Sequence, residues 1–233
     1  MDSQSASIHV ILPAGGSGTR FGGKTKKQFL EIAGKSILDH TVQKFLSAAQ
    51  VKDITLAVPK ESVQELRQHW QNEHRVRVVN GGSSRAESVY NGFCSIDITH
   101  PHQVVLVHDA VRPLLSLDLI DQIAKATRQW GAVVPGLPVT DTIKIISEKG
   151  LVVNTPSRSS LRAIQTPQGF QAEVLQKAYK KITERAAAYT DEAMLVEACG
   201  FEVRVIDGEE NNFKITRPED LEKAEKLLQE WGT

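Results

Sequence analysis

The sequence predicts an α/β protein built on a mostly parallel sheet with helices on both faces. Apolar segments of strand length alternate with amphipathic segments of helix length along most of the chain, which is the pattern of repeated βαβ units. The segment 104–107 is apolar throughout, as expected of a strand buried on both faces in the centre of such a sheet. The composition, with 40% hydrophobic and 24% charged residues among 233, is that of a globular protein with a substantial core.

The expected elements follow from this periodicity. Strands are expected at 8–12, 54–58, 76–79, 104–107, 132–134 and 203–206, and helices at 61–71, 84–95, 117–130 and 174–188.

Two further helices are expected from their capping signals. Thr190 is the expected N-cap of one, with Asp191 and Glu192 in its first turn. Thr216 and Glu219 have the spacing of a capping box for the last helix.

The alternation of strands and helices breaks after Pro138. Residues 142–146 and 151–154 flank a Ser-Glu-Lys-Gly turn, so a β-hairpin is expected there. From the residues alone, a dimer arm and an ordinary surface hairpin are equally good interpretations. We expect a single domain over residues 1–233, with a β-arm at about 139–160.

Charge and composition exclude several classes of protein. The 28 basic and 28 acidic residues cancel, so nothing argues for nucleic acid or an anionic membrane as a partner. No apolar stretch is long enough to span a bilayer, and residues 1–7 lack the regions of a signal peptide. We therefore expect a cytoplasmic protein, with Cys94 and Cys199 as buried small hydrophobes on helices.

The most informative segment follows the first strand. Residues 13–20 read Pro-Ala-Gly-Gly-Ser-Gly-Thr-Arg, and Lys27 follows shortly after. The glycines allow a tight turn whose bare N–H groups can face an anion, and Arg20 and Lys27 supply two cations. The segment has neither the ending of a Walker A motif nor the third small residue of a dinucleotide fingerprint. It predicts a phosphate-binding loop, and the alternative is a simple strand-to-helix turn.

A second Gly/Ser-rich segment, residues 80–88, lies between a predicted strand and a predicted helix. Such a turn can hold a base or a ribose with its backbone groups. Ser84 and Glu87 within it also have the spacing of a capping box. Both interpretations can hold together, because the cap would fix the shape of the turn.

A third motif ends the apolar strand 104–107 with His108 and Asp109, and Arg112 follows. Ligands of open α/β sheets bind outside the carboxyl ends of the strands. A carboxylate at that edge can hold Mg²⁺ bridging substrate phosphates, so Asp109 is the candidate metal ligand. The alternative is a structural turn in which Arg112 stabilises Asp109. The histidines show no zinc-ligand spacing.

In their order along the chain, these motifs resemble the 2-C-methyl-D-erythritol 4-phosphate cytidylyltransferase family nearly end to end. Each motif is short, but the joint order is highly specific. The matching segments are 13–20, 27–29, 81–88, 108–113, 141–142, 166–168, 190–192 and 214–216. The chain departs from the family pattern at Lys26, where a proline is expected, at Ser83, where an acidic residue is common, and at Leu161-Arg162, which replaces Leu-Trp.

This resemblance implies a Rossmann-like nucleotidyltransferase fold and a homodimer built by the β-arm. It implies that CTP and 2-C-methyl-D-erythritol 4-phosphate give the CDP-alcohol and pyrophosphate, with Mg²⁺ or another divalent cation as cofactor. That reaction is a step of non-mevalonate isoprenoid synthesis. A ribitol-5-phosphate cytidylyltransferase is the nearest alternative. A non-catalytic nucleotide-binding module is a weaker one, because a binder does not need both Arg20 and Lys27.

The resemblance also implies roles for individual residues. Arg20 and Lys27 would stabilise charge on the α-phosphate in the transition state. Lys214 and Arg158 of the partner subunit would position the substrate phosphate. The CTP-binding residues would be Pro13, Ala14, Gly15, Gly16, Gly18, Gly82, Ser83, Arg85, Ser88 and Ala110. The polyol site would be lined by Asp109, Arg112, Thr142, Thr166 and Thr190.

Overall fold

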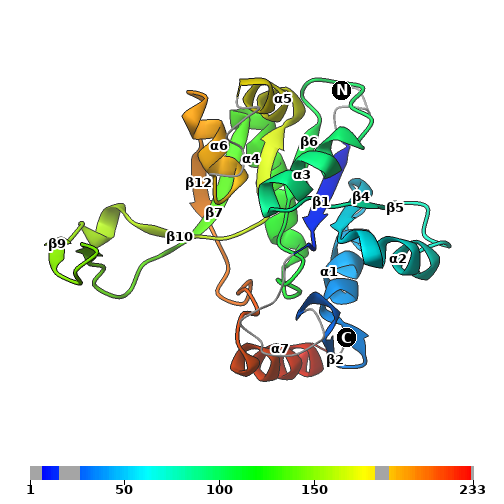
Figure 1. Ribbon diagram of the computed structural model, residues 1–233, viewed down its shortest axis with the longest axis horizontal. Helices are drawn as coiled ribbons and strands as arrows, with labels where there is room; N and C mark the ends of the chain where they lie inside the picture. Colours follow the sequence, from blue (N-terminus) through cyan, green and yellow to red (C-terminus); the bar gives the residue numbers. More distant parts are fainter. Residues whose placement is uncertain (1–6, 16–26, 182–188, 232–233) are drawn as a thin grey trace.

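The computed structural model describes residues 7–15, 27–181 and 189–231, which are built around one mixed sheet (Figure 1). Its strands lie in the order β10-β7-β11-β6-β1-β4-β5, and β12 pairs with β7. The central strand is β1 (Ile8–Pro13), which pairs in parallel with β6 (Val104–Val107) and β4 (Val51–Val58). The parallel half ends at β5 (Val76–Asn80).

The other half of the sheet contains antiparallel strands. Here β11 (Gln168–Gln171) lies between β6 and β7 (Ala132–Pro138) and is antiparallel to both. On β7, β10 (Arg162–Ile164) pairs antiparallel and β12 (Arg204–Asp207) pairs parallel. The predicted α/β fold with its mostly parallel centre is therefore confirmed.

Helices cover both faces of the sheet, because alternate strand residues point to opposite sides. Val10 and Leu106 belong to one core cluster, whereas Ile11 and Val105 belong to the other. The first cluster packs against α1 (Ile37–Leu46), α2 (Val63–His69) and α4 (Leu117–Trp130). The second packs against α3 (Arg85–Cys94), α5 (Ala172–Lys181) and α6 (Glu192–Ala198).

A third, smaller cluster lies at the carboxyl end of the strands. It contains Leu114, Ile215 and residues of α7 (Pro218–Glu230), packed against the short hairpin of β2 (Glu31–Ile32) and β3 (Lys35–Ser36). Figure 1 shows α7 beside β2, away from the two helical layers. This cluster holds the C-terminal segment against the chain that follows β1.

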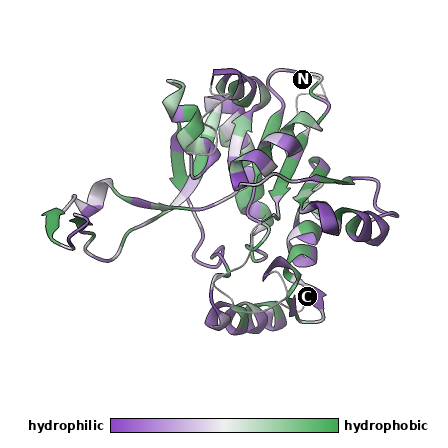
Figure 2. Ribbon diagram, viewed as in Figure 1, coloured by the Kyte–Doolittle hydropathy of each residue, from purple (hydrophilic) through white to green (hydrophobic). Residues whose placement is uncertain are grey.

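The predicted hairpin projects from the body of the molecule as an arm (Figure 1). It consists of β8 (Ile145–Ile146) and β9 (Val152–Asn154), followed by the 3₁₀ helix η5 (Arg158–Ser160). Figure 2 shows a hydrophobic tip at this hairpin. Leu151 and Val153 are 67% and 66% exposed, so the tip leaves uncovered most of the apolar surface that a hairpin usually packs against a core.

Several boundaries differ from the expected ones. The helix expected at 61–71 begins as the 3₁₀ helix η4 (Lys60–Ser62) and ends with α2. The α6 N-cap is Asp191, not Thr190, because the Asp191 carboxylate accepts from the backbone N–H of Met194 at 2.9 Å. Part of the expected helix 174–188 lies outside the described residues, since α5 is described to Lys181.

The last helix also starts differently. Its N-cap is Arg217, and the Asp220 carboxylate, rather than that of Glu219, accepts from the N–H groups of Thr216 and Arg217 at 2.7 and 2.8 Å. Cys199 is buried as predicted, but Cys94 is exposed. Cys94 is the last residue of α3, and the buried face of that helix is formed by Val89 and Phe93.

No helix among the described residues is both long and apolar enough to cross a membrane.

Candidate active site

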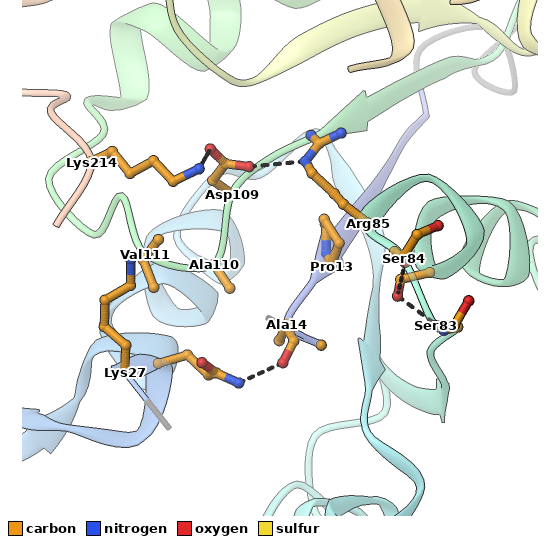
Figure 3. Close-up of a pocket in the computed structure, with 14 residues that line it drawn as sticks. Pro13, Ala14, Lys27, Ser83, Ser84, Arg85, Asp109, Ala110, Val111 and Lys214 are labelled. Carbon is orange, nitrogen blue, oxygen red and sulfur yellow. Dashed lines mark hydrogen bonds and ion pairs between the residues drawn. The ribbon is translucent and has the colours of Figure 1, made fainter. Parts of the chain in front are cut away.

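A cavity of about 390 Å³ lies where β1, β5 and β6 end. It is lined by Pro13, Ala14, Gly15, Lys27, Gln28, Gly82, Ser83, Ser84, Arg85, Ser88, Asp109, Ala110, Val111 and Lys214. Figure 3 shows Lys27 and Lys214 on one side of the cavity and Ser83 and Ser84 on the other. Chain segments far apart in sequence thus bring cations to face a Gly/Ser turn.

The end of β1 forms the floor between the two sides. Ala14 donates its N–H to the carbonyl of Ala57 at 2.9 Å, and its own carbonyl accepts from Nε2 of the buried Gln28 at 2.6 Å. A Cβ atom at Gly15 would lie 3.2 Å from Ser88 Oγ. The first glycine of the loop therefore allows the close approach of β1 to the second turn.

The second turn is held by its own hydrogen bonds. Ser88 Oγ accepts from the N–H of Gly82 at 3.0 Å and donates to the carbonyl of Ser84 at 2.8 Å. Ser84 Oγ caps α3 by accepting from the N–H of Glu87. The Glu87 carboxylate accepts from the N–H and Oγ of Ser83 at 2.7 and 2.6 Å, one residue further back than in a standard capping box. The cap and the turn are thus one structure.

Asp109 is the electrostatic centre of the cavity. Its Oδ1 lies 3.3 Å from Arg85 Nε, and its Oδ2 lies 3.0 Å from Lys214 Nζ and 3.6 Å from Arg112 Nε. Burial alone would raise the pKa of this carboxyl, but the three cations hold it well below its usual range. The surrounding cations therefore favour the ionised form of Asp109.

Arg85 joins Asp109 to a second carboxylate. Its Nη1 lies 2.7 Å from Oε2 of Glu192, which is only 2% exposed. Burial by itself would lower the pKa of Arg85, but Glu192 and Asp109 raise it above its ordinary value. The guanidinium consequently stays charged and spans the two carboxylates.

His108 is connected to the backbone of Asp109 through the hydroxyl of Thr166. The Asp109 N–H donates to Thr166 Oγ1 at 3.1 Å, Thr166 Oγ1 lies 3.0 Å from His108 Nδ1, and His108 Nε2 lies 3.1 Å from the carbonyl of Arg112. One neutral tautomer satisfies all three contacts, with Nε2 as donor and Nδ1 as acceptor. Burial lowers the pKa of His108 to about 4, which keeps that tautomer neutral.

Most sequence-predicted site residues that the structure describes line the cavity. They are Pro13, Ala14, Gly15, Lys27, Gly82, Ser83, Arg85, Ser88, Asp109, Ala110 and Lys214. Arg112 and Thr166 do not line it, but they contact Asp109. Gly16, Gly18 and Arg20 lie outside the described residues.

Three predicted residues are not brought to the cavity by this chain. Thr142 and Arg158 are exposed on the arm, where Arg158 Nη1 donates to the carbonyl of Thr140 at 2.7 Å. Thr190 is exposed at the start of α6, with Oγ1 3.8 Å from Met194 Sδ. None of the three lines the cavity, and their contacts with substrate stay predictions.

The described residues do not by themselves complete a metal centre at Asp109. Both carboxylate oxygens are already within ion-pair distance of cations, and a cation ligand normally faces the metal instead. No group of three His, Cys, Asp or Glu residues in the described ranges could hold a metal ion. Asp109 therefore anchors three side-chain cations in this structure, and its contact with Mg²⁺ stays a prediction.

Sequence reasoning missed three polar contributors. Gln28 and Ser84 line the cavity, and Glu192 holds Arg85 from outside it. Gln28 follows Lys27 directly, and Ser84 was assigned only a capping role, so both carried a local signal. The partner of Glu192 is 107 residues away, and no local pattern indicates such a pair.

Comparison with known proteins identifies what this arrangement is similar to. The family model for 2-C-methyl-D-erythritol 4-phosphate cytidylyltransferase matches residues 8–230. The curated enzyme of that name from Symbiobacterium thermophilum is 41% identical over 96% of this chain and 93% of its own length. The one from Prochlorococcus marinus is 37% identical over 96% of this chain and 100% of its own length.

Solved structures agree with the sequence comparison. The crystal structure of 4-diphosphocytidyl-2C-methyl-D-erythritol synthase from Anaerococcus prevotii has a TM-score of 0.83 at 30% identity, covering 97% of this chain and 99% of that one. The structure of the cytidylyltransferase from Francisella tularensis has a TM-score of 0.81 at 31% identity, covering 95% and 100%.

The neutral His108 predicts a pH dependence of stability. Because the pKa of His108 falls from 6.5 to about 4 on folding, the unfolded chain binds the extra proton between these values. The contribution of His108 to stability is thus complete above the unfolded pKa and decreases as pH falls from 6.5 to about 4. We expect this contribution to be about 3 kcal/mol at most.

The measurement is the free energy of urea unfolding against pH for the wild type and His108→Asn. The variant should be less stable near pH 7, and its stability should fall less steeply on acidification. Parallel curves for the two proteins over that range would show that His108 does not fold in the neutral form.

Proposed function

Because the chain belongs to the 2-C-methyl-D-erythritol 4-phosphate cytidylyltransferase family, we propose that the cavity at Asp109 is its active site. The family reaction joins CTP and 2-C-methyl-D-erythritol 4-phosphate into 4-diphosphocytidyl-2-C-methyl-D-erythritol and releases pyrophosphate. This enzyme is therefore a nucleotidyltransferase of the non-mevalonate isoprenoid pathway. The observation that carries the proposal is that Lys27 and Lys214 face the turn 82–85 across one cavity.

The chemistry requires two anions to approach each other. An oxygen of the acceptor phosphate attacks the α-phosphorus of CTP, a new P–O bond forms, and the bond to the leaving pyrophosphate breaks. The acceptor phosphate is already ionised at neutral pH, so no side chain has to remove a proton. The protein must instead hold the two substrates in line and offset their repulsion with fixed cations.

We assign the nucleotide to the side of the cavity formed by β1 and the second turn. Gly82, Ser83 and Ser88 are placed to hold the cytosine end, because their turn is already fixed before any ligand binds. Lys27, together with Arg20 from the glycine loop, is assigned to the α-phosphate. The stabilisation that these cations provide is largest in the transition state, because the negative charge on the α-phosphate increases there.

We assign the acceptor to the side that contains Asp109 and Lys214. The contact between Lys214 Nζ and Asp109 Oδ2 at 3.0 Å holds a flexible ammonium group in one place, which lowers the entropic cost of binding a phosphate there. Arg112 and Thr166 hold Asp109 in turn. Thr142 and Thr190 remain proposed polyol contacts.

We propose that the arm makes the enzyme a homodimer. Its exposed apolar tip, with Ile146, Leu151 and Val153 at least 61% exposed, is typical of a surface that a partner covers. The arm would then carry Arg158 of the partner subunit to the acceptor phosphate. A symmetric dimer would exchange two arms and complete two sites.

A divalent cation is the usual companion of a nucleoside triphosphate, and we propose Mg²⁺ as the cofactor. Because Asp109 is paired with side-chain cations in this structure, we assign no ligand for Mg²⁺ among the described residues. A cytoplasmic location remains our proposal.

The role of Lys27 predicts a selective kinetic defect. In Lys27→Ala, we expect kcat to fall by at least about 10²-fold, because a cation that acts on the transition state is lost. The matched control is Lys52→Ala. Lys52 is an exposed lysine near the start of β4, at the amino end of the strands, whereas the cavity lies at their carboxyl ends. Initial rates of pyrophosphate release with saturating CTP measure the effect. Full turnover by Lys27→Ala would remove Lys27 from the chemistry.

A shared active site predicts complementation between two inactive variants. Arg158→Ala and Lys27→Ala should each be nearly inactive alone. After unfolding and refolding as an equal mixture, half of the dimers would be mixed and each would hold one intact site, giving about a quarter of wild-type activity. Absence of any recovery, with mixed dimers confirmed by mass, would mean that Arg158 does not act across the dimer.

A further inference from the structure

We propose that Glu192 is a positioning residue for the acceptor phosphate, which it controls through Arg85, Asp109 and Lys214. The proposal rests on the assignment of Lys214 to that phosphate. Glu192 itself does not line the cavity. It is nevertheless connected to the cavity by a series of ion pairs, in which Glu192 contacts Arg85, Arg85 contacts Asp109, and Asp109 contacts Lys214.

The start of α6 is held by contacts other than those of the Glu192 carboxylate. The α6 N-terminus is capped by Asp191, whose Oδ2 also accepts from Gln168 Nε2 at 2.9 Å. Gln168 Oε1 accepts from the N–H of Ala193 at 3.2 Å. These contacts attach α6 to β11 without Glu192. A fully buried carboxylate destabilises a protein unless it is paired. We therefore explain the presence of Glu192 by its ion pair with Arg85.

Glu192 determines how Arg85 meets Asp109. A guanidinium often binds a carboxylate through two parallel N–H groups. Here Nη1 of Arg85 is held by Glu192 at 2.7 Å, and Nε alone contacts Asp109, at Oδ1 and 3.3 Å. Nη2 makes no hydrogen bond to another described residue. With Arg85 held by Glu192 in this way, Asp109 Oδ2 is shared by Lys214, at 3.0 Å, and Arg112, at 3.6 Å, and does not contact Arg85.

The charge balance of the cluster depends on Glu192. Three cations, Arg85, Arg112 and Lys214, lie against the two carboxylates of Asp109 and Glu192. Without the charge of Glu192, all three cations compete for Asp109 alone. Arg85 would then move its second N–H toward Asp109 and weaken the contact that holds Lys214.

The nucleotide side should be affected less than the acceptor side. The second turn is fixed by hydrogen bonds among Gly82, Ser83, Ser84, Glu87 and Ser88, none of which involves Arg85 or Glu192. Loss of the Glu192 charge should therefore alter acceptor binding more than CTP binding, which it can reach only through Arg85. A purely structural defect would affect both substrates.

Glu192→Gln removes the charge and keeps the size of the side chain, so it is the test variant. We expect the KM for 2-C-methyl-D-erythritol 4-phosphate to rise by at least about fivefold and the KM for CTP to change by less than about twofold. Glu197→Gln, on the exposed side of the same helix, is the matched control and should leave both values unchanged. Equal changes in the two KM values, or no change in either, would overturn the proposal.

If Glu192→Gln does not fold, as judged by its thermal unfolding, Glu192→Asp takes its place. That variant keeps the charge but shortens its reach, and the same selective rise in the acceptor KM is expected. A variant that folds like the wild type and shows no selectivity between the substrates would overturn the proposal.

A double-variant comparison separates this proposal from the site assignment. Lys214→Ala should raise the acceptor KM, and adding Glu192→Gln to it should cause no further rise, because Glu192 acts through Lys214. If Lys214→Ala has no effect, the assignment of Lys214 is wrong. If it has the expected effect while Glu192→Gln alone has none, or an equal effect in both backgrounds, only the role of Glu192 is refuted.

Discussion

The Asp109 carboxylate, paired with Arg85, Arg112 and Lys214, is the interaction on which the rest of the site depends. One buried negative charge organises three positive ones, and each comes from a different part of the chain. Removing a partner from such a buried group is costly because the remaining charges are left uncompensated. The same attraction that stabilises the fold here therefore holds three cations in a fixed arrangement beside the cavity.

The sheet places this carboxylate where three elements converge. Asp109 follows β6, Arg85 is the first residue of α3, and Glu192 is the first residue of α6. Thr166, just before β11, accepts the Asp109 N–H and also contacts the neutral His108. The antiparallel insertion of β11 beside β6 thus brings Thr166 into contact with Asp109 and Gln168 into contact with the start of α6.

Local sequence patterns predicted the elements that are regular and buried. The strand 104–107 and the helix 117–130 match in full, because their apolar periodicity is unambiguous. The strand β11, Gln-Gly-Phe-Gln, was missed because its polar side chains carry no such pattern and its burial comes from its neighbours. The helix α1, with buried His40 and Thr41, was also missed.

The site shows the same division. The position of Asp109 at a strand end indicated a functional carboxylate, but only the folded chain shows that cations occupy both of its oxygens. A metal role and an ion-pair role have the same local sequence. The ion pair of Asp109 with Lys214 distinguishes the two roles, and Lys214 is 105 residues further along the chain (214 minus 109). Long-range pairs of this kind cannot be read from spacing alone.

We infer that Asp109 acts by holding cations and not by binding a metal. The most direct test is the steady-state kinetics of Asp109→Asn at varied Mg²⁺ concentration. For Asp109→Asn we expect kcat/KM for the acceptor to fall by at least about tenfold, while the Mg²⁺ concentration for half-maximal rate stays at the wild-type value. Recovery of wild-type kcat/KM in excess Mg²⁺, with a raised half-maximal concentration, would contradict it.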